Sequence, residues 1–244
     1  MEITSKTNAK VKQWVKYHQK KYRDQDKVFF IEGEHLIEEA MSKNCVDTLM
    51  IRSGSVNRFT FDGPTYYLAD EVMDKLSTNI SKVYYIALCK QVKKDLHDAT
   101  RILLLDDVQN PGNLGTIVRT AHSFGFDGIY ASKNCVDLYN EKTIRSTQGA
   151  LFHIPYMQCD LLDCISTLQK DGFTVLATSL RNAKALSDME ESEKVAIVLG
   201  NEGSGVHDAI IDACDASIKI EMYAFESLNV AIAGGICMYK FRKK

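Results

Sequence analysis

Three stretches, two of which contain several glycines, combine polar side chains at a spacing that could do chemistry. They read NPGNLGTIVRTA at 110–121, LGNEGSGV at 199–206 and ESLNVAIA at 226–233. Each places amide, carboxylate, hydroxyl or guanidinium groups beside backbone that small residues leave open to a ligand. Groups of these types can orient a polar substrate and stabilise a negative charge that develops during a reaction.

The first stretch predicts the end of a strand and the start of a helix. Pro111 and Gly112 stop the strand, and we expect Asn113 to cap the helix. The free amides of a helix N-terminus suit a polar or anionic ligand. Arg119 lies off the predicted buried stripe, and the alternative is an ordinary turn followed by an exposed arginine. That stripe consists of Leu114, Ile117, Val118, Ala121 and Phe124.

The second and third stretches each have a feature that ordinary loops lack. The second has neither the lysine of a phosphate-binding P-loop nor the G-x-G-x-x-G spacing of a dinucleotide-dependent oxidoreductase, and Glu202 stands among its glycines. In the third, Ser227 and Asn229 precede a helix with many small residues, although a simple serine cap would look similar. We expect the apolar face of this helix to include Val230, Ala233, Ile236 and Cys237.

The strands that must position these stretches are near-continuous apolar runs. We predict them at 101–107, 128–132, 173–179, 195–200 and 216–220, with helical patterns between them. This alternation indicates a parallel sheet covered on both faces. Ligands of such sheets bind at the carboxyl ends of the strands, where all three stretches begin.

The first part of the chain predicts a separate, smaller α/β unit. Short strands at 28–33, 47–52, 66–70 and 83–89 alternate with helices at 35–43 and 71–78. The charged segment KQVKKDLHDAT at 90–100 lacks a clear period. We therefore predict two domains, residues 1–97 and residues 98–244.

The N-terminal segment is strongly basic although the net charge of the chain is only −2. Residues 1–27 carry eight Lys or Arg against three Asp or Glu, with Trp14, Tyr17 and Tyr22 among them. Such a surface can contact phosphates and stack on bases, whereas a solvated lysine-rich helix is the alternative. The residues that we expect to bind RNA are Lys12, Lys16, Lys20 and Arg23.

Composition excludes several classes of protein. The 244 residues are 45% hydrophobic, which suffices for a globular core, and no apolar run approaches a membrane span. The first residues lack the apolar centre of a signal peptide. The seven cysteines are scattered without C-x-x-C spacing, so we expect reduced thiols, no disulfide framework and no metal. We expect a cytoplasmic protein.

Together, the three stretches resemble the signature motifs of the SpoU family of RNA ribose 2′-O-methyltransferases, within the SPOUT superfamily. The resemblance covers about residues 101–244. ITSKTNAKVKQW followed by FFIEGEHLIEEA is similar to the substrate-binding domain of rRNA-directed members. The resemblance implies an α/β fold in which a small substrate-binding domain precedes a parallel-sheet, trefoil-knotted methyltransferase domain. It also implies S-adenosylmethionine as cofactor and a homodimer with catalytic groups near the subunit interface.

The family motifs assign roles position by position. The implied catalytic residues are Asn113, Arg119, Glu202, Ser227 and Asn229. The implied cofactor-binding residues are Thr178, Ser179, Leu199, Gly200, Gly203, Ile220 and Leu228. Because guanidinium stays protonated in proteins, we expect Arg119 to stabilise charge on the ribose oxygen and a nearby phosphate.

The implied function is methylation of a ribose 2′-hydroxyl, and the N-terminal domain favours 23S rRNA as substrate. The third motif departs from the family pattern, because Glu221 replaces a proline, no glycine is present, and one residue fewer precedes Glu226. We expect an altered cofactor pocket there. One alternative is therefore a catalytically weak RNA-binding or ribosome-assembly protein. Another is a tRNA ribose methyltransferase, which the N-terminal domain argues against.

Overall fold

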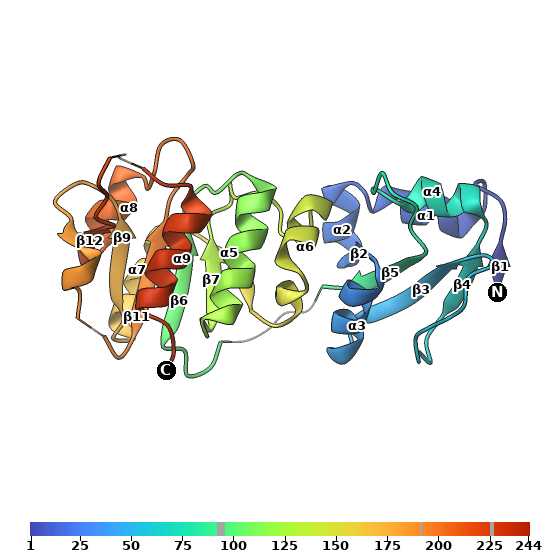
Figure 1. The fold of residues 1–244 in the computed structure, drawn as a ribbon, viewed down its shortest axis with the longest axis horizontal. Helices are drawn as coiled ribbons and strands as arrows, with labels where there is room; N and C mark the ends of the chain where they lie inside the picture. Colours follow the sequence, from blue (N-terminus) through green and yellow to red (C-terminus); the bar gives the residue numbers. More distant parts are fainter. Residues whose placement is uncertain (92–95, 191, 225–226) are drawn as a thin grey trace.

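The chain forms two α/β units that lie end to end (Figure 1). The computed structural model describes residues 1–91, 96–190, 192–224 and 227–244. The N-terminal unit, residues 1–91, holds a five-stranded sheet, and the C-terminal unit, residues 96–244, holds a seven-stranded sheet. Part of the predicted boundary segment at 90–100 lies outside the described residues.

The N-terminal sheet has the strand order β1-β4-β3-β5-β2. Strand β4 pairs in parallel with β1 and β3, whereas β5 pairs antiparallel with β3 and β2. Every strand and helix predicted in this part of the chain is present with slightly shifted ends. Its elements are β1 (Glu2–Ile3), α1 (Ala9–Lys16), α2 (Lys20–Asp26), β2 (Val28–Glu32), α3 (Glu34–Ser42), β3 (Val46–Arg52), β4 (Thr65–Leu68), α4 (Asp70–Leu76) and β5 (Tyr85–Lys90).

All pairings in the C-terminal sheet are parallel, in the order β10-β12-β9-β11-β6-β7-β8. The five apolar runs predicted as strands are β6, β7, β9, β11 and β12. The elements are β6 (Arg101–Leu105), α5 (Pro111–Ser123), β7 (Gly128–Ala131), α6 (Glu141–Thr147), η1 (Ala150–Phe152), β8 (Tyr156–Gln158), α7 (Leu161–Lys170), β9 (Thr174–Thr178), β10 (Lys184–Ala185), η2 (Leu186–Asp188), β11 (Val195–Leu199), α8 (Asp208–Ala213), β12 (Ala216–Lys219) and α9 (Val230–Lys240).

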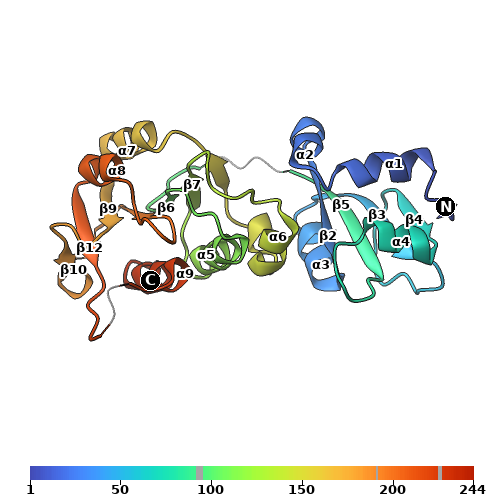
Figure 2. The ribbon, with the colours of Figure 1, turned by 90° about the horizontal axis from the view of Figure 1, so that it is seen from above.

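Both faces of the C-terminal sheet are buried, as the apolar runs predict. Along β6, Leu103 and Leu105 belong to the cluster under α5 and α9, whereas Ile102 and Leu104 belong to the cluster under α7 and α8. This alternation follows from the two-residue period of a strand. Figure 2 shows α7 and α8 on one side of the sheet and α5 and α9 on the other.

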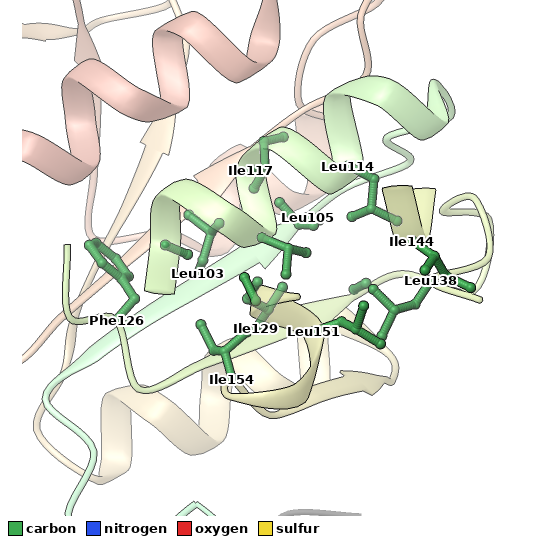
Figure 3. Packing of buried hydrophobic residues seen from close by; sticks show 14 of the residues in the cluster. Leu103, Leu105, Leu114, Ile117, Phe126, Ile129, Leu138, Ile144, Leu151 and Ile154 are labelled. Atoms are coloured by element: carbon green, nitrogen blue, oxygen red, sulfur yellow. The ribbon is translucent and has the colours of Figure 1, made fainter. Parts of the chain in front are cut away.

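Helix α5 is fixed by packing on two sides. Its Leu114 and Ile117 lie over β6 and β7 (Figure 3). On another side it meets α6 at Gly115, where an added Cβ would lie 2.6 Å from the Thr143 carbonyl oxygen and 2.4 Å from the Ser146 Cβ. Gly115 in the first motif is therefore required by helix packing. The predicted stripe is confirmed as buried, except that Phe124 is only partly covered.

Helix α9 buries only part of the face predicted for it. Val230 and Cys237 are buried as expected, but Ile236 is 39% exposed. The prediction is wrong there because Gly234 faces the sheet, where its missing Cβ leaves room for the Leu199 side chain. The turn of the helix therefore leaves an apolar strip at the surface, formed by Ile232, Ile236 and Tyr239.

The two units share a continuous apolar core. Phe29 of β2 lies with its ring centre 4.4 Å from that of Tyr139 and 6.0 Å from that of Phe152. This contact is flanked by an ion pair between Arg23 and Asp137 at 2.6 Å and by a hydrogen bond between Glu39 and His153 at 2.6 Å. The units are thus held by side chains of both, whereas the other face of the N-terminal sheet packs on α1 and α4.

Within the described residues, no helix is both long and apolar enough to cross a membrane. The seven cysteines are all free thiols, as predicted. The knot expected from the family depends on how the segment before α9 threads the chain. That segment includes residues 225 and 226, which lie outside the described residues.

Candidate functional site

The three motif loops meet at one edge of the C-terminal sheet. The first leads from β6 into α5, the second from β11 into α8, and the third from β12 into α9. Strands β6 and β11 are parallel neighbours, so their carboxyl ends lie together. Direct hydrogen bonds between side chains join the three loops.

A chain of three side chains joins the loops. The Asn113 Nδ2 donates to Glu202 Oε1 at 2.9 Å, and the Asn229 Nδ2 donates to Asn113 Oδ1 at 3.0 Å. The direction of both bonds follows from the partners, since a carboxylate only accepts. At the far end, Asn229 Oδ1 accepts the Ala231 amide at 2.9 Å and caps α9. Three predicted catalytic residues are therefore brought together.

Glu202 also binds the backbone at the start of α5. Its carboxylate accepts the amides of Gln109 at 3.2 Å and Asn110 at 2.9 Å. Burial raises the pKa of Glu202, but the bonds from Asn113 and these amides outweigh burial and hold the pKa below its ordinary value. Glu202 is thus ionised, and its hydrogen bonds hold the second loop to the start of helix α5.

The helix cap differs from the prediction. Asn110, not Asn113, caps α5, because its Oδ1 accepts the amides of Gly112 at 2.8 Å and Asn113 at 3.2 Å. Pro111 then occupies the first helical position, which it favours because it has no amide hydrogen to satisfy. Asn113 therefore lies inside the first turn, and its side chain is available to Glu202.

The glycines of the second loop serve its backbone turn. Asn201 and Gly205 bond each other through their backbones, and a Cβ on Gly200 would lie 2.1 Å from the Gly205 carbonyl carbon. The Asn201 side chain closes the turn by accepting the Gly203 amide at 2.8 Å, and donates to the Asp107 carbonyl at 2.8 Å. Only a residue without a side chain fits at Gly200.

A cavity of about 510 Å³ opens beside this network. Its volume suits a cofactor-sized ligand. Apolar walls from Val206, Ile218 and Ile220 alternate with polar groups of Ser179 and Asn201. Six of the seven predicted cofactor residues line it, namely Thr178, Ser179, Gly200, Gly203, Ile220 and Leu228.

Leu199 is the predicted cofactor residue that does not line the cavity. Its side chain is fully buried against Gly234, and its carbonyl accepts the Asp106 amide at 2.8 Å. Both features turn it toward the core.

In the altered third loop, the carboxylate of Glu221 accepts a hydrogen bond from the Ser187 hydroxyl. Glu226, which completes that motif, lies outside the described residues.

The remaining two predicted catalytic residues lie outside the hydrogen-bonded chain. Ser227 lines the cavity next to Leu228. Arg119 is exposed on α5, and its guanidinium has no hydrogen bond or ion pair with another described residue. The structure thus leaves the Arg119 charge open to a ligand or to another chain.

The predicted RNA-binding segment divides into exposed and buried residues. Lys12, Lys16 and Lys20 are exposed. Arg23 is 7% exposed and binds the Asp137 carboxylate and the carbonyls of Tyr17 and His18, so the prediction that it binds RNA is wrong. Its charge is already neutralised within the fold.

The aromatic residues of this segment are also buried. Trp14 and Tyr17 are each 5% exposed and pack in the N-terminal core, so they do not form the stacking surface that was predicted. Tyr22 is partly exposed and lies 5.6 Å from the Lys16 Nζ. The surface of the segment is therefore one of lysines.

Several residues of the site were missed by sequence reasoning. Arg181 and Asp208 line the cavity and bind each other at 3.0 Å. Asp106 and Asp107 follow directly after β6 and contact the second loop and its end at His207. The only signal for the aspartates was their place directly after an apolar strand, where ligand sites gather.

The fold and the site define an α/β enzyme that holds a ligand at the carboxyl edge of a parallel sheet. The sequence pattern of the SpoU rRNA Methylase family matches residues 100–239. The pattern of an MRM3-like substrate binding domain matches residues 8–81. The chain therefore belongs to the SpoU rRNA methylase family, as its motifs predicted.

Known proteins resemble the chain over nearly its whole length. The 23S rRNA (guanosine(2553)-2′-O)-methyltransferase RlmP of Bacillus subtilis (strain 168) is 36% identical over 99% of both chains. An rRNA methyltransferase from Sinorhizobium meliloti superposes with a TM-score of 0.88 at 29% identity, covering 98% of this chain and 96% of that one. Its AdoMet-bound structure superposes with a TM-score of 0.87 at 28% identity, with the same coverage.

Proposed function

We propose that this protein transfers a methyl group from S-adenosylmethionine to a ribose 2′-hydroxyl of 23S rRNA. The observation that carries the proposal is the Glu202–Asn113–Asn229 chain beside a cofactor-sized cavity. The proteins with the same architecture include a 23S rRNA 2′-O-methyltransferase and an AdoMet-bound rRNA methyltransferase. A 2′-hydroxyl restricts the substrate to RNA, because DNA lacks this group.

The cavity fits S-adenosylmethionine by its chemistry. Val206, Ile218 and Ile220 offer apolar surface to an adenine ring, and the polar groups near Ser179 and Asn201 suit the ribose and amino-acid parts. Leu228 and Ser227 close the side toward the network. When bound, the cofactor supplies an electrophilic methyl group, and the protein has to orient the acceptor oxygen toward it.

The network performs the positioning part of the reaction. Glu202 fixes the Asn113 amide from one side and Asn229 fixes it from the other, so the amide does not reorient when substrate arrives. Such preorganisation lowers the barrier because the ordering is complete before the reaction. Asn113 and Ser227 hold the ribose in this scheme.

Arg119 places a positive charge beside the ribose oxygen that attacks the methyl group. Its guanidinium stays protonated, so it stabilises charge on the ribose oxygen and an adjacent phosphate. A planar guanidinium can contact both at once, whereas an ammonium group is a point charge. Near-full activity of Arg119→Lys at neutral pH would contradict this role.

A homodimer would explain two features of the C-terminal unit. Ile232 is 56% and Tyr239 57% exposed on α9, although both are large and apolar in character. Such a strip on a helix is typical of a protein–protein contact. Arg119 lies on α5, which packs against α9, so a symmetric contact over these helices brings its charge toward a second copy.

The N-terminal unit delivers the RNA. The proposed boundary at 97/98 lies between β5 and β6, and the exposed Lys12, Lys16 and Lys20 offer phosphate contacts on the N-terminal side. Free cysteines and a ribosomal RNA substrate support a cytoplasmic location. The bonded network of intact motif residues argues against a non-catalytic protein of the same fold.

The experiment uses purified protein, labelled S-adenosylmethionine and separate preparations of 23S rRNA and tRNA. The proposal predicts label in 23S rRNA at a position that resists alkaline cleavage, since a methylated 2′-oxygen cannot attack the phosphate. Label in tRNA alone would establish the alternative substrate. Label that stays sensitive to alkali would mean that a base and not the ribose is methylated.

A further inference from the structure

One buried residue, Asp106, is bonded to both ends of the second motif loop, through its backbone amide at one end and its carboxylate at the other. Asp106 follows β6 and is 4% exposed. Its amide donates to the carbonyl of Leu199, the residue before the loop, at 2.8 Å. Its Oδ2 accepts from the residue after the loop, His207, at 2.8 Å from the backbone amide and 2.8 Å from Nδ1. The loop that carries Glu202 is thereby tied to β6.

The histidine ring completes this tie. Because Asp106 accepts, the His207 Nδ1 carries the proton. The hydrogen bond and charge of Asp106 raise the pKa of His207, and the nearby Asp107 and Asp208 act in the same direction. The ring is 56% exposed on its other side. His207 therefore presents a stable donor to a carboxylate that is otherwise buried.

The contact between Asp106 and His207 acts on the proposed catalytic network through the second motif loop, which carries Glu202. Between its two ends, Glu202 reaches across to the amides of Gln109 and Asn110 and to Asn113. The loop has one further bond to the same segment, from Asn201 to the Asp107 carbonyl at 2.8 Å. A shift of the loop end at His207 would therefore move Glu202 away from α5.

We infer that Asp106 and His207 form a positioning pair that fixes Glu202 and, through it, Asn113 for methyl transfer. The inference rests on the proposed function for its effect on the reaction, but the tie itself is a property of the fold. Asp106, Asp107 and His207 each offer a side-chain atom that could bind a metal ion, and these atoms lie within 4.8 Å of one another. Because the Asp106 Oδ2 already accepts two hydrogen bonds from His207, a hydrogen-bonded pair is favoured over a metal site.

Hydrogen exchange tests the tie without reference to activity. In His207→Ala, the amides of Gln109 and Asn110 should exchange about tenfold faster than in the wild type, because Glu202 no longer holds them. His207→Asn should restore most of the protection, since its amide nitrogen stands near the position of Nδ1. Unchanged exchange in His207→Ala, with the fold intact, would overturn the inference.

A double-mutant cycle tests the effect on the reaction. His207→Ala should lower kcat about tenfold in the wild type, but less than about twofold in a Glu202→Ala background, because both act through one chain of contacts. Equal losses in both backgrounds would overturn the positioning role. If wild type shows no methylation, the proposed function fails, and the exchange experiment still decides whether the pair holds Glu202.

The matched control is the other carboxylate–histidine pair, Glu39 and His153, which lies between the units. His153→Asn should leave exchange at residues 109 and 110 unchanged. Faster exchange there in His153→Asn would mean that any lost pair loosens the loop, which contradicts a specific tie. If His207→Ala does not fold, His207→Gln replaces it, since its amide cannot reach Asp106 with the geometry of Nδ1.

Discussion

The two units of this protein use polar residues in opposite ways. In the C-terminal unit, Glu202, Asn113 and Asn229 are bonded to one another and to backbone amides, so few groups are left to move. In the N-terminal unit, Lys12 and Lys16 extend from α1 into solvent above a buried aromatic core. Methyl transfer needs fixed geometry, whereas binding of an RNA backbone needs accessible charge.

The difference predicts separable defects. A change in the network should reduce turnover and spare RNA affinity, whereas removal of the lysines should do the reverse. Both units share one core through Phe29, so the separation is one of function and not of folding.

The largest effect is expected from Glu202→Ala. The substitution frees two backbone amides and one side of the Asn113 amide, and loss of one such preorganised contact costs about 10²-fold in turnover. Single-turnover methylation at saturating RNA measures it. Glu38→Ala, on the exposed side of α3, is the control and should have wild-type activity. An equal loss of RNA affinity in Glu202→Ala would break the separation of the units.

The next effect concerns RNA affinity. Changing Lys12, Lys16 and Lys20 together to glutamine should weaken RNA binding at least about tenfold at low salt and reduce the salt slope by about 2, at roughly 0.7 per single-stranded phosphate contact. Binding titrations over a range of salt measure both. The same change at Lys43, Lys170 and Lys194 should have less effect. An unchanged slope in the first variant would remove α1 and α2 from the RNA contact.

A smaller effect is expected from the glycine between α5 and α6. Gly115→Ala places a Cβ 2.6 Å from a backbone oxygen, and such overpacking costs about 1–3 kcal/mol of unfolding free energy. Gly235→Ala is the control, because its nearest neighbour would lie at 3.8 Å and alanine favours a helix by about 1 kcal/mol. Denaturant unfolding measures both. Equal stability of the two variants would mean that α5 and α6 separate easily.

The smallest effect is a dependence on pH. The pKa of Glu202 is lower in the folded protein than in the unfolded chain, so its contribution to stability is complete above the ordinary value of about 4.3 and is lost as pH falls through the folded value. The difference in unfolding free energy between wild type and Glu202→Gln should therefore shrink below about pH 4.5. A difference that grows toward acid would mean that Glu202 is held protonated.

The sequence predicted the parts of the fold that depend on short-range pattern. The apolar runs of the C-terminal unit became parallel strands, and the loops after β6, β11 and β12 met because parallel strands end at one edge. The resemblance of the three motifs to the SpoU family then indicated Asn113, Glu202 and Asn229 as catalytic residues. Their contacts span 89 and 116 residues, so the pattern alone could not give the bonds.

The errors arose where one residue type has two roles. Trp14 and Tyr17 continue the helical spacing that begins at Val11, and this spacing marked the buried face of the first helix. Arg23 is buried because the carboxylate of Asp137, 114 residues away in the sequence, forms an ion pair with its guanidinium. For the cap of α5, Pro111 was the better signal, since proline at the first helical position implies that the cap precedes it.

The most direct test compares 23S rRNA from cells that lack this protein and carry either the wild-type protein or Arg119→Ala. Ribose methylation is mapped by resistance to alkaline cleavage, and the amount of each protein is matched. We expect one resistant position that the wild type restores and Arg119→Ala does not. A resistant position restored equally by both would contradict a catalytic role for the charge of Arg119, and no restored position would contradict rRNA ribose methylation itself.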